Sequence, residues 1–96
     1  MGLLDLLRRK QDNTEGARRA RLLRTGRIAE GHIIDIGTDE GGHTTHIFYA
    51  YEVNGVEYES SQTLDDAQRT HAADYAPGAP VTIRFDPRHP ANSVVV

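Results

Sequence analysis

The sequence predicts a mainly β fold, a small five-stranded antiparallel barrel of the SH3-like or OB-like kind. Three observations predict it. The pair Asn54-Gly55 separates two alternating apolar runs, which is the strongest short-range signal for a β-hairpin. Apolar alternation returns at Val81–Phe85, and the chain ends in the valine-rich run Ser93–Val96. A chain of 96 residues is long enough for one core, so we expect one barrel with an amino-terminal amphipathic helix and a short helix before strand four.

The amino-terminal region, residues 1–24, is expected to be a basic amphipathic helical arm, and residues 25–96 the β-barrel domain. Its leucines fall within an arc of roughly 160° on a helical wheel, and they are Leu3, Leu4, Leu6 and Leu7. Four leucines so close together need a surface on which to dock. The segment Thr14–Arg24 continues either as a second helix or as a basic linker.

The first strand is expected at Arg27–Ile36, followed by a turn-like loop at Gly37–His43. A symmetric loop gives the pairs Ile33–Ile47, Gly31–Tyr49 and Ala29–Tyr51. Small residues opposite the tyrosines would make room for their rings. This register leaves three apolar side chains on the opposite face of the sheet, namely Ile34, Ile36 and Phe48.

The hairpin at Asn54-Gly55 has a register that follows from its two-residue turn. The expected pairs are Val53–Val56, Glu52–Glu57, Tyr51–Tyr58, Ala50–Glu59 and Tyr49–Ser60. Cross-strand aromatic and β-branched pairs stabilise a sheet, whereas like charges directly opposite destabilise it. The tyrosine and valine face is therefore expected in the core. The face that carries Glu52, Glu57 and Glu59 must meet water or a basic partner.

The carboxyl-terminal third is expected to begin with a short helix over about Asp65–Asp74, since Thr63–Asp66 resembles a capping box. Pro77-Gly78 would stop this helix. The strand Val81–Phe85 should direct Val81, Ile83 and Phe85 inward. Asp86–Pro90 should form a stiff turn, and the last strand, Ser93–Val96, should be paired because a bare valine edge would aggregate.

Several of these residues carry a resemblance to a known family. The runs Tyr49–Tyr58 and Tyr75–Pro87, with Pro90 and Ser93, resemble the bacterial family called domain of unknown function 3592, over about residues 24–96. The shared motifs are structural, so the resemblance implies a fold and no catalysis. Members of that family often lie beside transmembrane helices, whereas no run in this chain reaches the ~20 apolar residues of a membrane span.

The residues that could carry catalysis or metal binding are scattered. His43 and His46 are three apart, and in an extended chain such residues point to opposite faces, so they do not predict a metal site. Asp39-Glu40 lacks the regular oxygen spacing of a calcium loop. The serines lack a nucleophile elbow, no glycine-rich phosphate loop is present, and the chain has no cysteine. We therefore expect no enzyme, no cofactor, no metal and no small-molecule substrate.

The charge is divided unevenly along the chain. Residues 1–27 hold eight bases and three acids, a net +5, whereas residues 28–96 hold three bases and eleven acids, a net −8. Such asymmetry indicates an arm that contacts an anionic surface. No aromatic residue lies among the bases of the arm, which argues against specific nucleic-acid binding. The remaining surfaces are an anionic membrane and protein, either a partner or a second copy in a homodimer.

The hypothesis that satisfies most features is a non-enzymatic interaction module, self-associating or partner-binding through its amino-terminal helix and its acidic hairpin face. The residues expected to bind the partner are Leu3, Leu4, Leu7, Arg18, Arg19, Ile34, Phe48, Glu52, Glu57 and Glu59. The alternative is a peripheral membrane adaptor that places the leucine-rich basic helix on anionic lipid. The expected location is the cytoplasm, either free or peripheral at the inner face of the membrane.

Overall fold

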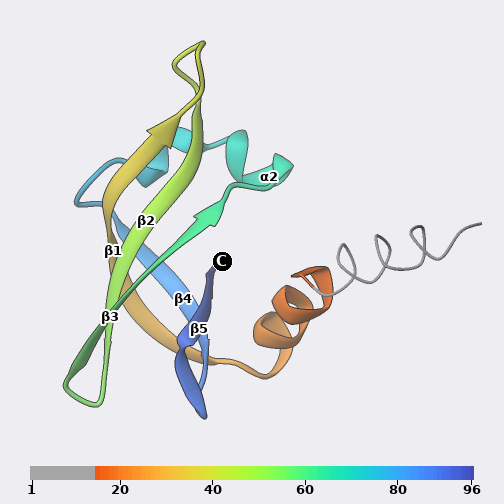
Figure 1. Cartoon of the computed structure of the whole chain (residues 1–96), viewed down its shortest axis with the longest axis vertical. Coiled ribbons are helices and arrows are strands. Elements are labelled where there is room, and N and C mark those ends of the chain that lie inside the picture. Colours follow the sequence, from red (N-terminus) through yellow and green to blue (C-terminus); the bar gives the residue numbers. More distant parts are fainter. Residues whose placement is uncertain (1–14) are drawn as a thin grey trace, which may run out of the picture.

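The computed structural model describes residues 15–96, so the docking predicted for the leucines of the first seven residues lies outside the described residues. One sheet dominates the structure (Figure 1). Its strands are β1 (Arg27–Thr38), β2 (Thr44–Val53), β3 (Val56–Thr63), β4 (Pro80–Asp86) and β5 (His89–Val95). They are antiparallel in the order β3-β2-β1-β4-β5, and the sheet curls into a nearly closed barrel. The predicted fold class is confirmed.

The β2–β3 hairpin has the predicted register. All five expected pairs are present, from Val53–Val56 to Tyr49–Ser60. Asn54 and Gly55 have φ values of 52° and 81°, the left-handed conformation that a two-residue hairpin turn requires. Tyr49 and Tyr51 are buried in the core. The turn chemistry therefore determines which face of this hairpin lies inside.

The β1–β2 pair differs from the prediction. Ile33 pairs with Tyr49 and Gly31 with Tyr51, two residues away from the symmetric-loop register. The register then shifts again between Ile33 and Asp35, where Ile34 is the extra residue of a β-bulge. One extra residue in a strand turns the side chains that follow it to the opposite face of the sheet. Ile36 consequently pairs with Ile47 and packs against the core, so its predicted place on the opposite face was wrong.

Gly31 needs its missing side chain, although for a different partner than expected. It lies opposite Tyr51, and a Cβ atom built on it would be 2.5 Å from Ile83 Cδ1 and 3.1 Å from Tyr51 Cβ. It would also collide with the carbonyl oxygen of Ala50. A glycine is therefore required where β1 crosses between β2 and β4.

Among residues 15–96, every buried polar side-chain atom has a hydrogen-bond partner. Tyr49 Oη lies 2.8 Å from Ser93 Oγ inside the barrel, and Tyr51 Oη donates to the carbonyl of Pro90. The ring of Tyr51 stacks on both Tyr49 and Tyr58, with centroids 5.9 and 5.7 Å apart. Burial raises the pKa of Tyr51, which keeps its phenol protonated as a donor. These bonds tie β2 to β5 across the interior.

The edge strands β3 and β5 are joined by side-chain amides. The backbone N–H of Val95 donates to Gln62 Oε1 at 2.8 Å, and its carbonyl accepts from Gln62 Nε2 at 3.3 Å and from Gln68 Nε2 at 3.0 Å. An amide side chain has the same donor and acceptor as a peptide group. Two glutamines therefore close the barrel at the carboxyl end of β5.

The segment predicted as one helix over Asp65–Asp74 forms two shorter ones, α2 (Asp66–Arg69) and the 3₁₀-helix η1 (Ala72–Tyr75). A capping box is present, but it begins at Asp65 and ends at Gln68, two residues after the predicted box of Thr63–Asp66. The chain leaves helical geometry at His71, where φ is −131°. This break lets Tyr75 enter the core from η1.

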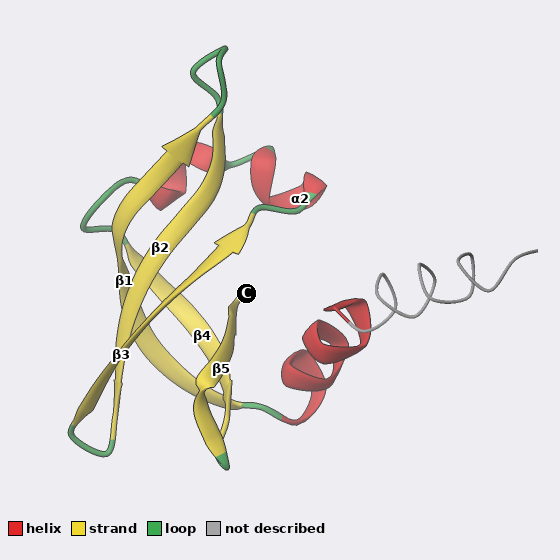
Figure 2. Cartoon of the chain, viewed as in Figure 1, coloured by secondary structure: helices red, strands yellow, loops and turns green. Residues whose placement is uncertain are grey.

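The structure shows a helix over residues 15–25, where the sequence allowed either a helix or a linker (Figure 2). The helix packs on the outside of the barrel. Arg18 donates to Asn92 Oδ1 at 2.6 Å and to the carbonyl of Ser93 at 3.3 Å. Leu22 is buried, and Arg84 donates to the carbonyl of Gly26 at 3.0 Å where the chain turns into β1. These contacts fix the helix beside β4 and β5.

Candidate interaction surface

The outer surface of β1, β2 and β3 carries four exposed glutamates, which we call the acidic face: Glu30, Glu52, Glu57 and Glu59. Glu52 and Glu57 are directly opposite each other, and Glu59 is opposite Ala50. The small side chain of Ala50 lies at the floor of a groove of about 310 Å³ that Glu30, Glu52 and Glu57 line. The three glutamates predicted from the hairpin therefore share one face.

Glu30 was missed by the sequence reasoning. Its neighbour His32 pairs with Ala50, an outward-facing residue of β2, so Glu30 joins the same outer surface. The signal was available in the alternation of β1, where Glu30 is an odd number of residues from the inward-facing Ile33.

Two apolar side chains lie beside the glutamates. Ile34 and Phe48 are each 40% exposed. Phe48 is opposite Asp35, the residue that directly follows Ile34 in β1, so the bulge brings Ile34 and Phe48 close together. The two were predicted to lie on the face opposite the core and to need a cover, and both are exposed in residues 15–96.

The acidic face has no cationic partner within the described part of the chain. The ion pairs among residues 15–96 join Arg18 to Glu15, Arg19 to Asp65 and two histidines to nearby aspartates. Like charges opposed across a sheet destabilise it, as at Glu52 and Glu57. A basic partner would relieve this repulsion.

Arg18 and Arg19 were expected to bind the partner, and within this chain neither forms an ion pair with these glutamates. Arg18 Nη2 lies 2.7 Å from Glu15 Oε1, and Arg19 Nη2 lies 2.8 Å from Asp65 Oδ2. The hydrogen bond from Arg18 lowers the pKa of Glu15. The helix is held over β5 by Leu22 and by the bonds of Arg18, which keeps both arginines away from the acidic face.

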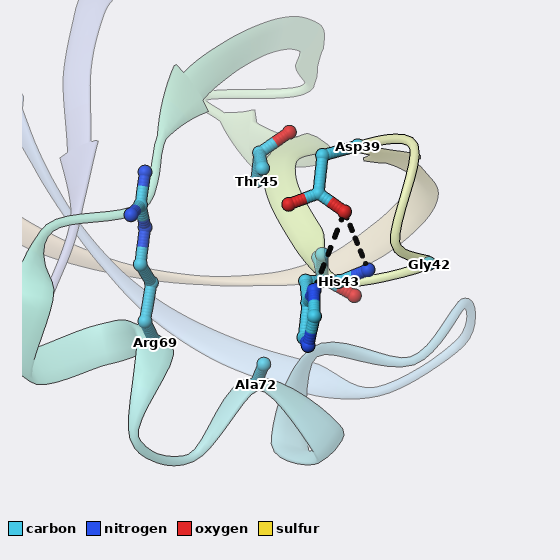
Figure 3. Close-up of a pocket in the computed structure, with 7 residues that line it drawn as sticks. Asp39, Gly42, His43, Thr45, Arg69 and Ala72 are labelled. Atoms are coloured by element: carbon cyan, nitrogen blue, oxygen red, sulfur yellow. Dashed lines mark hydrogen bonds and ion pairs between the residues drawn. The ribbon is translucent and has the colours of Figure 1, made fainter.

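A second hollow, of about 500 Å³, lies between the β1–β2 turn and η1 (Figure 3). Asp39 and His43 face Arg69 and Ala72 across it. Asp39 Oδ1 accepts from the backbone N–H groups of Gly41 and His43, both at 2.9 Å. The His43 N–H bond is the main reason that the pKa of Asp39 is lowered. Asp39 therefore acts as a clamp for the turn.

The arrangement in this hollow offers little for acid–base or metal chemistry. His43 Nδ1 is 3.4 Å from Asp39 Oδ1, but this carboxylate oxygen already accepts two backbone donors. His46 faces a different groove, between β3 and the helix of residues 15–25. Among residues 15–96, no three His, Asp or Glu side chains are grouped so that they could hold a metal ion.

Comparison with known proteins places the barrel in a family. The family described as Domain of unknown function (DUF3592) matches residues 24–96. The chain belongs to this family. The resemblance seen in the sequence is thereby confirmed. No curated protein and no solved structure matches the chain.

The DUF3592 match begins at the end of the helix of residues 15–25 and includes the whole sheet. The acidic face, Ile34 and Phe48 thus lie within the DUF3592 domain. Arg18 and Arg19 precede it. The acidic surface is a feature of the domain itself, and the helix that packs beside β5 is mostly outside the match.

Proposed function

We propose that this DUF3592 domain is a non-enzymatic protein-interaction module whose acidic face binds a basic, leucine-rich segment. One observation carries the proposal. Four glutamates without an ion-pair partner among residues 15–96 share the outer surface of the sheet with the exposed side chains of Ile34 and Phe48. Burial of the apolar pair supplies affinity, and the charges select the partner and speed its association.

The partner chemistry that fits is found in the chain's own amino-terminal region. Residues 1–27 have a net charge of +5 and contain the leucines predicted to bind, Leu3, Leu4 and Leu7. Such a region can bind from the same chain, from a second copy or from another protein. The common requirement is arginine or lysine next to aliphatic side chains.

A direct test uses a fluorescently labelled peptide of residues 1–27, titrated with the full-length protein and followed by anisotropy. We expect binding that weakens with salt, since exposed charges are screened. Glu52→Gln/Glu57→Gln/Glu59→Gln should weaken it by roughly tenfold, because three exposed ion pairs of about 0.5 kcal/mol each are lost.

The matched control removes the same charge elsewhere. Glu40, Asp66 and Asp74 are exposed and lie outside the acidic face. Glu40→Gln/Asp66→Asn/Asp74→Asn should bind the peptide as the parent protein does. Equal binding by both triple variants would show that net charge alone attracts the peptide, and would refute a specific acidic face.

A second candidate is a peripheral membrane adaptor. It is favoured by the exposure of Leu23 and Ile28, 42% and 61%, beside Arg24 and Arg27. Among the helices of residues 15–96, none is long and apolar enough to cross a bilayer. Sedimentation with anionic liposomes tests this function, and it requires binding at low salt that is lost at high salt.

A further inference from the structure

The turn between the helix of residues 15–25 and β1 carries a surface of opposite charge, which we call the basic turn. It consists of exposed arginines and two exposed aliphatic side chains: Arg21, Leu23, Arg24, Arg27 and Ile28. Arg88, from the β4–β5 turn, lines one groove together with Arg21, and Asp86 lines it as well.

These arginines are free of carboxylate partners within residues 15–96. The arginines that face the barrel are engaged, since Arg18 and Arg19 form ion pairs and Arg84 donates to Gly26. Neither Arg24 nor Arg27 has such a bond among the described residues. The molecule therefore displays two unneutralised surfaces of opposite sign, and each contains two exposed apolar side chains.

Among residues 15–96, the arginines of the basic turn form no ion pair with the acidic face of their own chain. Arg18 binds Asn92 and Ser93 of β5, and the carbonyl of Gly26 accepts from Arg84 of β4. The carboxyl end of the helix, with Arg21 and Arg24, is thus held beside β4 and β5, whereas Glu52, Glu57 and Glu59 lie on β2 and β3. Arg27 and Ile28 begin β1, the strand that also carries Glu30. In Figure 1 the β2–β3 hairpin and the helix-to-β1 connection lie on opposite sides of the lower end of the barrel.

We propose that the basic turn of one copy binds the acidic face of a second copy, in a head-to-tail contact. Arg24 and Arg27 would meet Glu52 and Glu57, and Leu23 and Ile28 would cover Ile34 and Phe48. This inference rests on the proposed function and names the partner as a second copy of the chain. Two different surfaces make the contact heterologous, so copies join into rings or chains instead of an isologous dimer.

The experiment reverses each surface separately in the full-length protein and measures mass by sedimentation velocity. One variant is Glu52→Lys/Glu57→Lys/Glu59→Lys, and the other is Arg21→Glu/Arg24→Glu/Arg27→Glu. The parent protein should associate, and each variant alone should associate about a hundredfold more weakly, because attraction becomes repulsion. Mixing the two variants should restore association, since each reversed surface then meets a complementary one.

Further measurements keep the outcomes distinct. Circular dichroism and thermal melting establish that each variant is folded. Recovery of association in the mixture is independent evidence that both variants are folded. The parent protein should dissociate as salt rises from about 0.1 M to about 1 M, where the Debye length falls from about 10 Å to about 3 Å. A parent protein that is monomeric at low salt, or a mixture that stays monomeric, would overturn the head-to-tail contact.

Three results separate this inference from the proposed function. If the peptide of residues 1–27 binds the acidic face while the parent protein is monomeric, the function stands and the second copy is the wrong partner. If the parent protein is monomeric and binds anionic liposomes through Arg21, Arg24 and Arg27, the basic turn binds lipid and the inference fails. If the peptide does not bind, the proposed function itself fails.

Discussion

The two hairpins that contain β2 have registers set by different means. In β2–β3, Asn54 and Gly55 adopt left-handed backbone conformations, and the strands follow from that turn. In β1–β2, the turn is held by the side chain of Asp39, and the bulge at Ile34 then shifts the pairing. A register set by backbone conformation can be predicted from residue type, whereas one set by side-chain bonds and a bulge depends on the folded surroundings.

The largest effect is expected at Gly31, where the backbone of β2 leaves no room for a Cβ atom on β1. Gly31→Ala places a Cβ atom against the backbone of Ala50 and 2.5 Å from Ile83 Cδ1, so the strands must separate. We expect a loss of about 3 kcal/mol in the free energy of unfolding, measured by urea denaturation. Gly16→Ala is the control, because nothing lies within 4 Å of that site. Equal stability of both variants would contradict the close approach.

The next effect concerns the turn of the β2–β3 hairpin. Gly55→Ala puts a side chain at a φ of 81°, which costs about 1–2 kcal/mol in the free energy of unfolding. The same substitution at Gly42, where φ is 79°, tests the turn of the other hairpin. Similar losses would show that both turns need a left-handed glycine. A loss at Gly42 alone would contradict our view that β2–β3 is set by its backbone.

The Asp39 clamp should make the β1–β2 turn sensitive to acid. The pKa of Asp39 is lowered in the folded protein by its bond to the His43 N–H, so ionised Asp39 stabilises the fold above its unfolded pKa, about 3.9. This contribution is lost as the pH falls through the folded pKa. Asp39→Asn keeps an acceptor oxygen but does not titrate. As the pH falls from 6, the melting temperature should decrease less in this variant than in the parent protein. Identical pH profiles would refute a stabilising role of ionised Asp39.

The smallest effect is expected on the outer face of the β2–β3 hairpin. Glu57→Lys replaces a like-charged pair with Glu52 by an opposite pair, and should raise the free energy of unfolding by about 0.2–1 kcal/mol. Glu40→Lys, in the β1–β2 turn, is the control for net charge. The gain in the free energy of unfolding of Glu57→Lys should disappear in high salt. The same variant should bind the peptide of residues 1–27 more weakly. A loss of stability would contradict the cross-strand pair of Glu52 and Glu57.

The features that could be predicted from the sequence divide in the same way. The hairpin pairs, the inward facing of Val81, Ile83 and Phe85, and the five-stranded antiparallel barrel were predicted correctly, because alternation and turn residues are local signals. The inward turn of Ile36 was missed, because a bulge has no marker in the sequence of β1.

On the candidate surface too, the local features were predicted and the long-range contacts were not. Glu52, Glu57 and Glu59 were assigned to one exposed face from the hairpin alone, and they share it. The intrachain contacts of Arg18 and Arg19 were not predicted, because Asn92 and Asp65 are 74 and 46 residues away in the sequence. Contacts over such separations depend on how the helix packs, which charge counting does not reveal.

The amides of Gln62 and Gln68 give the barrel a point of local opening. The other neighbouring strands are joined by backbone pairing, whereas here rotation of two side chains releases the N–H and the carbonyl of Val95 without disrupting any strand pair. The N–H of Val95 should therefore exchange with solvent deuterium much faster than that of Ile83, its neighbour in β4. Breathing of the barrel would begin at this seam, with the rest of the sheet intact.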